Sequence, residues 1–381
     1  MSSHFFRILF ASWIPGVAGI AAADEPPNFR AIVQPYVEQG RFVGANGVVV
    51  SRQGILAMPS AGVADFESRK PLAPNTLFWI ASTSKPFQAT AVMMLVDEGK
   101  VSLDEQVSKY LPQFKTLKSM SVRMLLNHTN GLSYSAPGQF RPTDCCSLSE
   151  EVERFVALPL MFEPGTKFMY SNAGPDTASR IVEVISGKSF EAFLTERLLE
   201  PLGMHDTAYF PKEEQLLRLA PGCLFDKAVN KLVRAPNEIF ITAPFGDRTA
   251  RHAPGGGLFS TGPDLALFVQ MLLNRGSLGG KRYLSEAAVA EMTRNQVPAE
   301  LMSMVPSLPG SDAPMGYGLG WGVGATGAYF HTGVAMTVIR IDPNRGFGTI
   351  LLSPQSQDEV GFELLMKLTS AANRHWDDQP R

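Results

Sequence analysis

The sequence has little of what would direct it to nucleic acid, a metal ion or a lipid bilayer. Its 381 residues carry 34 Lys and Arg against 36 Asp and Glu, without a run of one sign, so nothing favours nucleic acid or an acidic membrane surface. The six histidines are scattered, and no cluster of cysteine and histidine has zinc-ligand spacing, so we predict neither a metal nor another cofactor. No fixed-period repeat or heptad pattern is present, which excludes a solenoid and a coiled coil.

Cysteine is scarce, and its use depends on the compartment. If the compartment is oxidising, either Cys145 or Cys146 can pair with Cys223, and the odd count leaves one thiol free. The alternative is that all three are small buried or loop residues. Sequence does not give the connectivity of cysteines, so both alternatives stand.

The N-terminus is typical of an export signal. Arg7 supplies positive charge, an apolar stretch follows over 8–20, and the alanines at 21–23 put small residues before a cleavage point. We therefore predict a signal peptide over 1–23 and a periplasmic or secreted mature chain over 24–381. The alternative is an N-terminal membrane anchor, but the apolar stretch falls short of the roughly 20 residues of a membrane-spanning helix. No later stretch is long and apolar enough, so no stable membrane insertion is expected after cleavage.

Ser82, followed three residues later by Lys85, is the most informative pair in the chain. Residues three apart share one face of a helix, so the Lys85 amine can reach the Ser82 hydroxyl. A serine hydroxyl is a weak nucleophile until a neighbouring base accepts its proton, which makes Ser82 a candidate nucleophile and Lys85 a candidate base. Burial would favour the uncharged amine that a base requires. The alternative is an ordinary N-cap serine beside a solvated lysine.

Two further short sequences follow in order, Tyr-Ser-Asn at 170–172 and His-Thr-Gly at 331–333. The patterns Ser-x-x-Lys, Tyr-x-Asn and Lys/His-Thr-Gly each occur once in the chain. A Ser-x-x-Lys by itself would arise by chance about once in a chain of this size, so the combination is the signal. No Gly-x-Ser-x-Gly is present, which excludes the nucleophile turn of an α/β-hydrolase.

Strand patterns lie near both ends of the chain, and helix patterns fill the middle. Strands are predicted at 47–51, 55–58, 337–341 and 348–352, and helices over 28–38, 82–98, 176–185, 190–199, 263–274, 286–294 and 357–374. The simplest arrangement is one antiparallel sheet built from both ends, flanked by helices, with a helical region inserted. We therefore divide the mature chain into a sheet region over 24–80 and 315–381 and a helix-rich region over 81–314. A ligand site is expected where the two regions meet.

Longer stretches around these motifs add a family resemblance. They lie at 103–112, 125–132, 255–261 and 316–321. With the three short motifs in order, the chain resembles the serine β-lactamase and penicillin-binding protein superfamily, in the branch of class C β-lactamases, D,D-peptidases and family VIII esterases. The resemblance implies an α/β (α+β) fold of the β-lactamase/transpeptidase type across the mature chain. The Glu-x-x-Leu-Asn segment of class A enzymes is absent.

The resemblance also implies roles for residues in the first two motifs. Ser82 would be the nucleophile, and Lys85 and Tyr170 would move the protons. Which of these two acts first stays open, because such groups titrate as a pair. Asn172 would hydrogen-bond the acyl side of the substrate and the Lys85 ammonium.

The third motif is expected to line the substrate site from a strand at the edge of the sheet. By resemblance, His331, Thr332 and Gly333 would bind substrate, with Gly333 leaving room for the acyl group. The backbone N–H groups of Ser82 and Val334 would form an oxyanion hole, in which one donor is worth roughly 3 kcal/mol.

Two departures from the family pattern bear on substrate. His331 stands where β-lactamases usually carry Lys, so it would hold a substrate carboxylate less firmly. Met336 stands where many relatives have Gly, which predicts a bulkier loop and a narrower pocket. His128 is a possible partner for a serine, but we interpret it as a turn histidine packed under the site.

These observations predict a serine hydrolase that cleaves a small ester or amide through an acyl-serine intermediate, as an esterase or a D,D-carboxypeptidase or D-aminopeptidase would. The substrate would be a small molecule or a peptide. One alternative is a β-lactamase, and another is a non-catalytic protein that binds or senses a cell-wall peptide. The oligomeric state does not follow from the sequence.

Overall fold

The structure is a computed structural model of the chain. It describes residues 29–117, 119–133, 147–235, 254–305 and 315–371, apart from positions 362, 365, 366 and 369. The predicted signal peptide over 1–23 lies outside these residues, as do Cys145 and Cys146, so export and disulfide pairing stay predictions. Within the described ranges, no helix combines the length and the apolarity needed to cross a membrane.

The described residues form short helices and strands throughout. The α-helices are α1 (Phe29–Glu38), α2 (Lys85–Asp97), α3 (Val107–Tyr110), α4 (Val122–Leu126), α5 (Leu148–Ala157), α6 (Ala173–Ser186), α7 (Phe190–Leu194), α8 (Glu200–Leu202), α9 (Glu213–Leu216), α11 (Gly262–Leu273) and α12 (Glu286–Thr293). The 3₁₀ and π turns are η1 (Ala81–Ser84), η2 (Pro112–Phe114), η4 (Thr195–Leu199) and η5 (Ala299–Met304). The strands are β1 (Gly44–Ser51), β2 (Ile55–Ala57), β3 (Ser60–Gly62), β4 (Phe78–Trp79), β5 (Cys223–Asp226), β6 (Lys231–Arg234), β7 (Phe259–Ser260), β8 (Ser277–Leu278), β9 (Lys281–Arg282), β10 (Gly316–Tyr317), β11 (Gly322–Val323), β12 (Tyr329–Gly333), β13 (Thr337–Asp342) and β14 (Phe347–Leu352).

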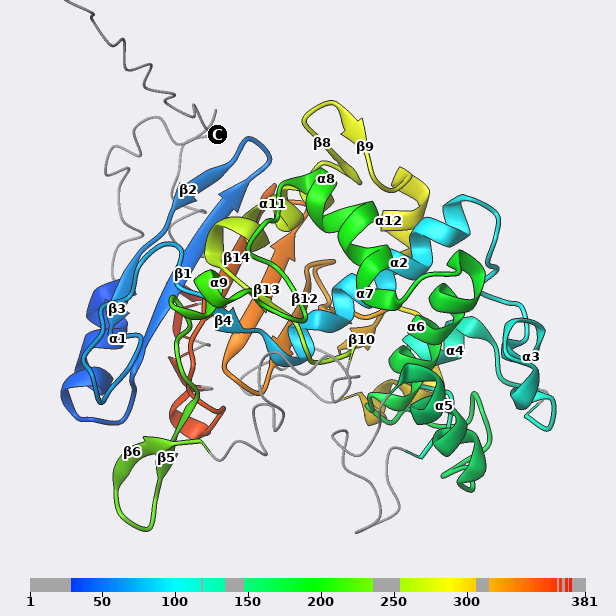
Figure 1. The fold of residues 1–381 in the computed structure, drawn as a ribbon, viewed down its shortest axis with the longest axis horizontal. Helices are drawn as coiled ribbons and strands as arrows, with labels where there is room; N and C mark the ends of the chain where they lie inside the picture. Colours follow the sequence, from blue (N-terminus) through cyan, green and yellow to red (C-terminus); the bar gives the residue numbers. More distant parts are fainter. Residues whose placement is uncertain are drawn as a thin grey trace, which may run out of the picture.

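One antiparallel sheet joins the two ends of the chain, as predicted. Its strand order is β10-β11-β12-β13-β14-β1-β2, and β3 also pairs with β1. The pairing of β1 with β14 connects the early and late strands, with a register that runs from Asn46 opposite Leu352 to Ser51 opposite Phe347. Figure 1 shows β1, β2 and β3 at the left, β12 and β10 near the middle of the molecule, and α3 to α6 at the right. The boundaries of the sheet and helix-rich regions stay a prediction.

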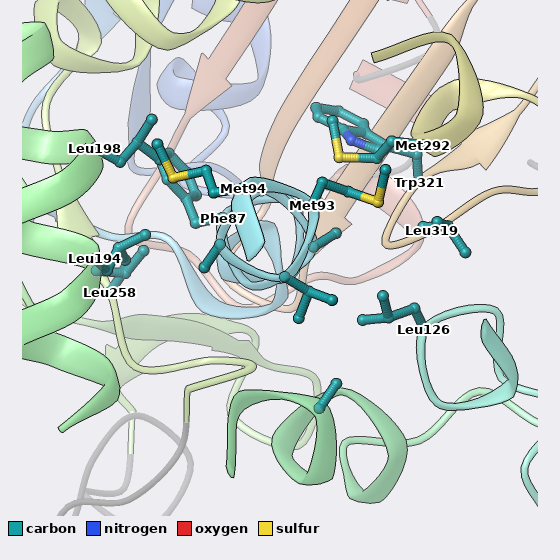
Figure 2. Packing of buried hydrophobic residues seen from close by; sticks show 14 of the residues in the cluster. Phe87, Met93, Met94, Leu126, Leu194, Leu198, Leu258, Met292, Leu319 and Trp321 are labelled. Atoms are coloured by element: carbon teal, nitrogen blue, oxygen red, sulfur yellow. The ribbon is translucent and has the colours of Figure 1, made fainter. Parts of the chain in front are cut away.

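Helix α2 crosses the core of the molecule. Every residue from 85 to 95 is buried, so the helix has no solvent-facing side over its first three turns. A helix that is apolar all round is expected to be enclosed by other elements. Figure 2 shows Phe87, Met93 and Met94 of this helix among side chains from other elements. This packing fixes the start of α2, where the Ser-x-x-Lys motif lies.

A second apolar cluster covers the other face of the sheet, beneath α1. It contains Phe29, Val33, Val338, Leu351 and Met336. Met336 is 2% exposed and adopts a left-handed φ of 47°, an unusual backbone angle for a residue with a side chain. The narrower pocket predicted from this residue is therefore wrong, because this cluster takes up its side chain.

The ends of several predicted helices differ from the structure. The helix predicted over 190–199 is α-helical only to Leu194, and 195–199 continue as a π-helix. Hydrophobic periodicity near 3.6 residues does not separate these two helix types, since both keep one apolar face. The helix predicted over 357–374 is present at the described positions from 359 to 371.

Candidate active site

Ser82 sits in a tight turn between the short strand β4 and helix α2. Its neighbour Ala81 has a left-handed φ of 48°, which costs energy for a residue with a Cβ. Such strained positions gather at functional sites, where the surrounding structure enforces them. Ser82 is half-buried, whereas Lys85, at the first position of α2, is only 1% exposed. The turn thus presents a hydroxyl next to a buried amine.

Lys85 makes three hydrogen bonds through its single amine. Nζ donates to Ser82 Oγ at 3.2 Å, to Asn172 Oδ1 at 2.6 Å and to Gly255 O at 2.9 Å. Two of these partners are carbonyl oxygens, which can only accept. An ammonium fills all three positions with N–H groups. A neutral amine keeps its two N–H groups on the carbonyl oxygens and turns its lone pair toward Ser82, whose hydroxyl can donate. When Lys85 loses or gains a proton, only its hydrogen bond with Ser82 therefore exchanges donor and acceptor.

A buried carboxylate supports this arrangement from behind. Asp176 Oδ1, on α6, accepts the Gly255 N–H at 2.9 Å and Gln88 Nε2 at 2.9 Å. Burial raises the pKa of Asp176 to about 6, although the Lys85 charge and these hydrogen bonds lower it. The pKa of Glu151 rises further, because it is buried and lies near the Asp176 charge. Asp176 thus holds Gly255 in place, and the carbonyl oxygen of Gly255 accepts a hydrogen bond from Lys85.

Two adjacent glycines give a matched test of this support. A Cβ on Gly255 would lie 3.1 Å from Asp176 Oδ1, 3.2 Å from Gln88 Oε1 and 3.4 Å from Asn172 Oδ1, whereas a Cβ on Gly256 would meet nothing within 4 Å. We expect Gly255→Ala to lower kcat on an ester substrate about tenfold, because Lys85 loses the placement of its acceptors. Gly256→Ala is the control and should match the wild type. Equal rates in the two variants would contradict this role for Gly255.

Tyr170 lies over the same amine but on the exposed side. Lys85 Nζ is 4.9 Å from the centre of the Tyr170 ring, and Tyr170 is 41% exposed. The ring packs against His128, with 4.5 Å between the ring centroids. Among the described residues, no hydrogen bond reaches the Tyr170 hydroxyl. The structure thus brings Tyr170 to Lys85 through its ring, and its role in proton transfer stays a prediction.

The His-Thr-Gly motif occupies the second half of β12. This strand lies inside the sheet and not at its edge, because β11 and β13 flank it. However, β11 pairs only with Tyr329 and Phe330, so residues 331–333 pair on one side alone, with β13. The predicted edge position is therefore wrong for the strand as a whole but holds locally. Thr332 is half-buried there, and Val334 just beyond is 45% exposed.

Gly333 packs closely against the turn that carries Ser82. A Cβ at this position would lie 2.2 Å from Thr337 Oγ1, 2.5 Å from Ile80 O and 3.1 Å from Ala81 Cβ. The hydroxyl of Thr337 donates to Ile80 O at 2.7 Å, which ties the strands to the same turn. The glycine is thus required for contact between β12 and η1. This differs from the expected reason, which was space for an acyl group.

His331 and His128 are both buried. His331 is 4% exposed, and burial together with the Lys85 charge lowers its pKa to about 3. Burial likewise holds the pKa of His128 well below its usual range. Both Nε2 atoms lie 3.1 Å from the Tyr317 hydroxyl. His128 therefore lies under the site as interpreted, and Tyr317 is its hydrogen-bond partner.

Sequence reasoning missed three residues that complete this arrangement. Gly255 and Tyr317 fall within the recurrent stretches at 255–261 and 316–321, but those stretches were used only for fold. Asp176 had no sequence signal beyond being an acidic residue in the first turn of a helix. Among the described residues, no three His, Cys, Asp or Glu side chains gather where they could hold a metal ion.

Comparison with known proteins agrees with the fold and with the enzyme class. The antiparallel sheet, the inserted helices and the Ser–Lys pair define a serine hydrolase of the β-lactamase type. A family model described as Beta-lactamase matches residues 29–371, and the chain belongs to this family. Penicillin-binding protein 4 of Amycolatopsis lactamdurans is 30% identical over 313 residues, which cover 77% of this chain and 76% of that protein. Esterase EstB of Burkholderia gladioli is 30% identical over 223 residues, or 54% of this chain and 57% of EstB.

Solved structures show the same fold at lower identity. EstCE1, a hydrolase with promiscuous acyltransferase activity, superposes with a TM-score of 0.76 at 23% identity, over 90% of this chain and 96% of EstCE1. Simvastatin synthase (LovD) of Aspergillus terreus gives a TM-score of 0.78 at 21% identity, over 92% of this chain and 98% of LovD. These likenesses establish the β-lactamase-type fold, and they do not identify a substrate.

Proposed function

We propose that this protein is an exported serine hydrolase that cleaves a small ester or amide through an acyl-Ser82 intermediate. The observation that carries the proposal is the set of three hydrogen bonds from Lys85 Nζ. The two carbonyl acceptors hold the amine in place, so that its remaining position faces the Ser82 hydroxyl. A protein that only bound peptides would have no need of a buried amine at that position.

In the first half-reaction, Lys85 takes the proton of Ser82 Oγ while this oxygen attacks the substrate carbonyl carbon. The carbonyl oxygen becomes an oxyanion, which the N–H groups of Ser82 and Val334 stabilise. The tetrahedral intermediate then collapses and breaks the bond to the leaving group, which receives the proton from Lys85, directly or through the Tyr170 hydroxyl. Asn172 and Thr332 hydrogen-bond the acyl part of the substrate.

In the second half-reaction, water attacks the acyl-Ser82 ester. Lys85, with Tyr170, accepts a proton from the water as its oxygen bonds to the carbonyl carbon. The second tetrahedral intermediate breaks its bond to Ser82 Oγ, and that oxygen recovers the proton. One water molecule is consumed, an acid is released, and the enzyme returns to its starting state.

The buried state of His331 favours esters over β-lactams. A β-lactam antibiotic carries a carboxylate, and a cationic side chain at this position would attract it. His331 has a pKa of about 3 because of its burial and the Lys85 charge, so it is uncharged at neutral pH. The likeness to an esterase and to a penicillin-binding protein is compatible with an ester or a β-lactam as substrate. The uncharged state of His331 supports the ester.

A substrate panel tests the proposed function. We expect turnover of short-chain p-nitrophenyl esters to exceed that of nitrocefin, a cephalosporin, by about tenfold or more in kcat/KM, on the scale of one lost charge-assisted contact. D-Ala-D-Ala peptides, which end in a carboxylate, should also be poor substrates. Faster turnover of nitrocefin than of any ester would show that the site is a β-lactamase. Folded protein without turnover of the panel would support a non-catalytic binder.

Export is a separate part of the proposal and rests on the N-terminal sequence. The charged residue, the apolar stretch and the alanines at 21–23 are the three parts of a signal peptide. Expression in a Gram-negative host should place the mature protein in the periplasm, with Asp24 as the first residue by N-terminal sequencing. A protein that keeps Met1 and stays with the membrane fraction would instead be anchored.

A further inference from the structure

Three buried side chains form a hydrogen-bonded chain beneath the proposed site. Tyr317 of β10 lies between His128, which follows α4, and His331 of β12, and all three are less than a tenth exposed. The Tyr317 hydroxyl is 3.1 Å from Nε2 of each histidine. The proposed mechanism uses neither Tyr317 nor His128, so their arrangement needs a separate explanation.

The groups at the two ends decide where the protons lie. His128 Nδ1 accepts the backbone N–H of Ser171 at 3.3 Å, so in the neutral ring the proton is on Nε2. His331 Nδ1 lies 2.9 Å from the carbonyl oxygen of Thr332, which can only accept, so Nδ1 carries the proton. The Tyr317 hydroxyl then accepts from His128 Nε2 and donates to His331 Nε2. With both rings neutral, this is the one arrangement that satisfies every group in the chain.

A positive charge on either histidine ring would disrupt this arrangement of donors and acceptors. If His331 were protonated, both of its nitrogens would donate, and the Tyr317 oxygen would face two N–H donors. The Tyr317 proton would then have no acceptor among the described residues. An unsatisfied buried donor is expensive, so the chain opposes protonation. The charged or titratable groups that face His331 are Lys85 of α2, Tyr170 before α6, and the other two members of the chain.

The hydrogen-bonded chain of His128, Tyr317 and His331 joins two walls of the proposed site. It starts at Ser171, between Tyr170 and Asn172, and it ends at Thr332, two residues before Val334. Displacement of Tyr317 would therefore disturb both the Tyr-x-Asn turn and the His-Thr-Gly strand.

We propose that Tyr317 is a positioning residue that holds His331 in its uncharged form with the proton on Nδ1, and thereby restricts the site to substrates that bring no carboxylate to residue 331. Both nitrogens of His331 are then used inside the protein. A substrate carboxylate finds neither a free N–H group nor a positive charge at residue 331, while a neutral ester needs neither. This inference rests on the proposed function and specifies the substrate class of the same site.

NMR of the wild-type protein labelled with ¹⁵N-histidine tests the chain without any turnover. We expect His331 to carry its proton on Nδ1 and His128 on Nε2, and both patterns to persist from about pH 8 down to about pH 5, where ordinary histidines become charged. The two signals are assigned by their loss in His331→Gln and His128→Gln. A charged His331 at about pH 6, or a proton on its Nε2 atom, would overturn the proposal.

A pair of Tyr→Phe variants tests the effect on substrates. Tyr317→Phe should lower kcat on p-nitrophenyl butyrate about tenfold with KM nearly unchanged, on the scale of one or two lost neutral hydrogen bonds. The wild-type preference for this ester over the mono-p-nitrophenyl ester of succinic acid should narrow at about pH 6, because the freed Nε2 can take up a proton. Tyr329→Phe is the control, since Tyr329 is equally buried on the same sheet and stands outside the chain.

The outcomes separate this inference from the proposed function. If Tyr317→Phe behaves like Tyr329→Phe in rate and in preference, Tyr317 is not a positioning residue, and the esterase proposal stands. If the wild type hydrolyses no ester, the proposed function fails together with the substrate restriction, and the NMR pattern still decides whether the chain exists. If Tyr317→Phe does not fold, the wild-type NMR pattern and the wild-type preference between the two esters decide the proposal.

Discussion

Ser82→Ala should abolish formation of the acyl-enzyme and lower kcat/KM on esters by about 10³-fold or more, the range seen when a nucleophile is removed from such a unit. The residue is half-buried in the turn before α2, and among the described residues its Oγ is the one hydroxyl that Lys85 hydrogen-bonds. Without that oxygen, no covalent bond to the substrate can form. Incubation with a fluorophosphonate, followed by intact-protein mass spectrometry, should show one adduct on the wild type and none on the variant.

Ser84→Ala is the matched control, since this serine belongs to the same four-residue motif. Its hydroxyl donates to Ala81 O at 2.6 Å and accepts the Leu258 N–H at 3.2 Å, so it supports the turn and does not face Lys85. We expect this variant to lose thermal stability but to keep the adduct. An adduct that persists in Ser82→Ala and disappears in Ser84→Ala would move the nucleophile to residue 84.

Lys85→Met should reduce kcat/KM by about 10²- to 10⁴-fold, the usual contribution of a positioned proton-transfer group. Methionine is close to lysine in length but carries no amine, so the Ser82 proton loses its acceptor. The change also leaves the carbonyl oxygens of Asn172 and Gly255 without their donor, and some loss of stability is expected. The rate of fluorophosphonate labelling measures the effect on the nucleophile directly, and circular dichroism reports the fold.

Two comparisons make the result on Lys85 specific. Lys100→Met removes an exposed lysine just beyond the end of α2. This lysine pairs with Glu98, and its loss should leave the labelling rate unchanged. The double variant Ser82→Ala with Lys85→Met should be no slower than Ser82→Ala alone, because residues that act as one unit are not additive. A Lys85→Met protein that labels at the wild-type rate would show that another group accepts the proton.

Much of the fold followed from hydrophobic patterns. The strands at both ends and the helices between them were visible because a period near 2 or 3.6 residues records which face is buried. The position of β12 inside the sheet was not visible, because a strand pattern does not state how many neighbours the strand has. Likewise, the left-handed backbone at Ala81 and Met336 has no sequence signal, since neither residue is a glycine.

Some contacts of the candidate site were likewise predictable from the sequence, and others were not. The proximity of Ser82 and Lys85 was predictable, because helix geometry alone fixes the distance between residues three apart. The acceptors of Lys85 were predictable only in part: Asn172 came from the family pattern, whereas Gly255 and the Asp176 behind it did not. Those contacts join segments that are far apart in the chain, and no local rule places them.

The sequence by itself determined that a hydroxyl and an amine would lie one helical turn apart, and that the chain would build a sheet from its two ends. Both results depend on spacing along the chain, which regular backbone geometry converts into spatial neighbours. Only the tertiary structure decided that His331 is buried. Burial and the charge of Lys85 lower the pKa of this histidine, and both effects arise only when separate elements meet on folding.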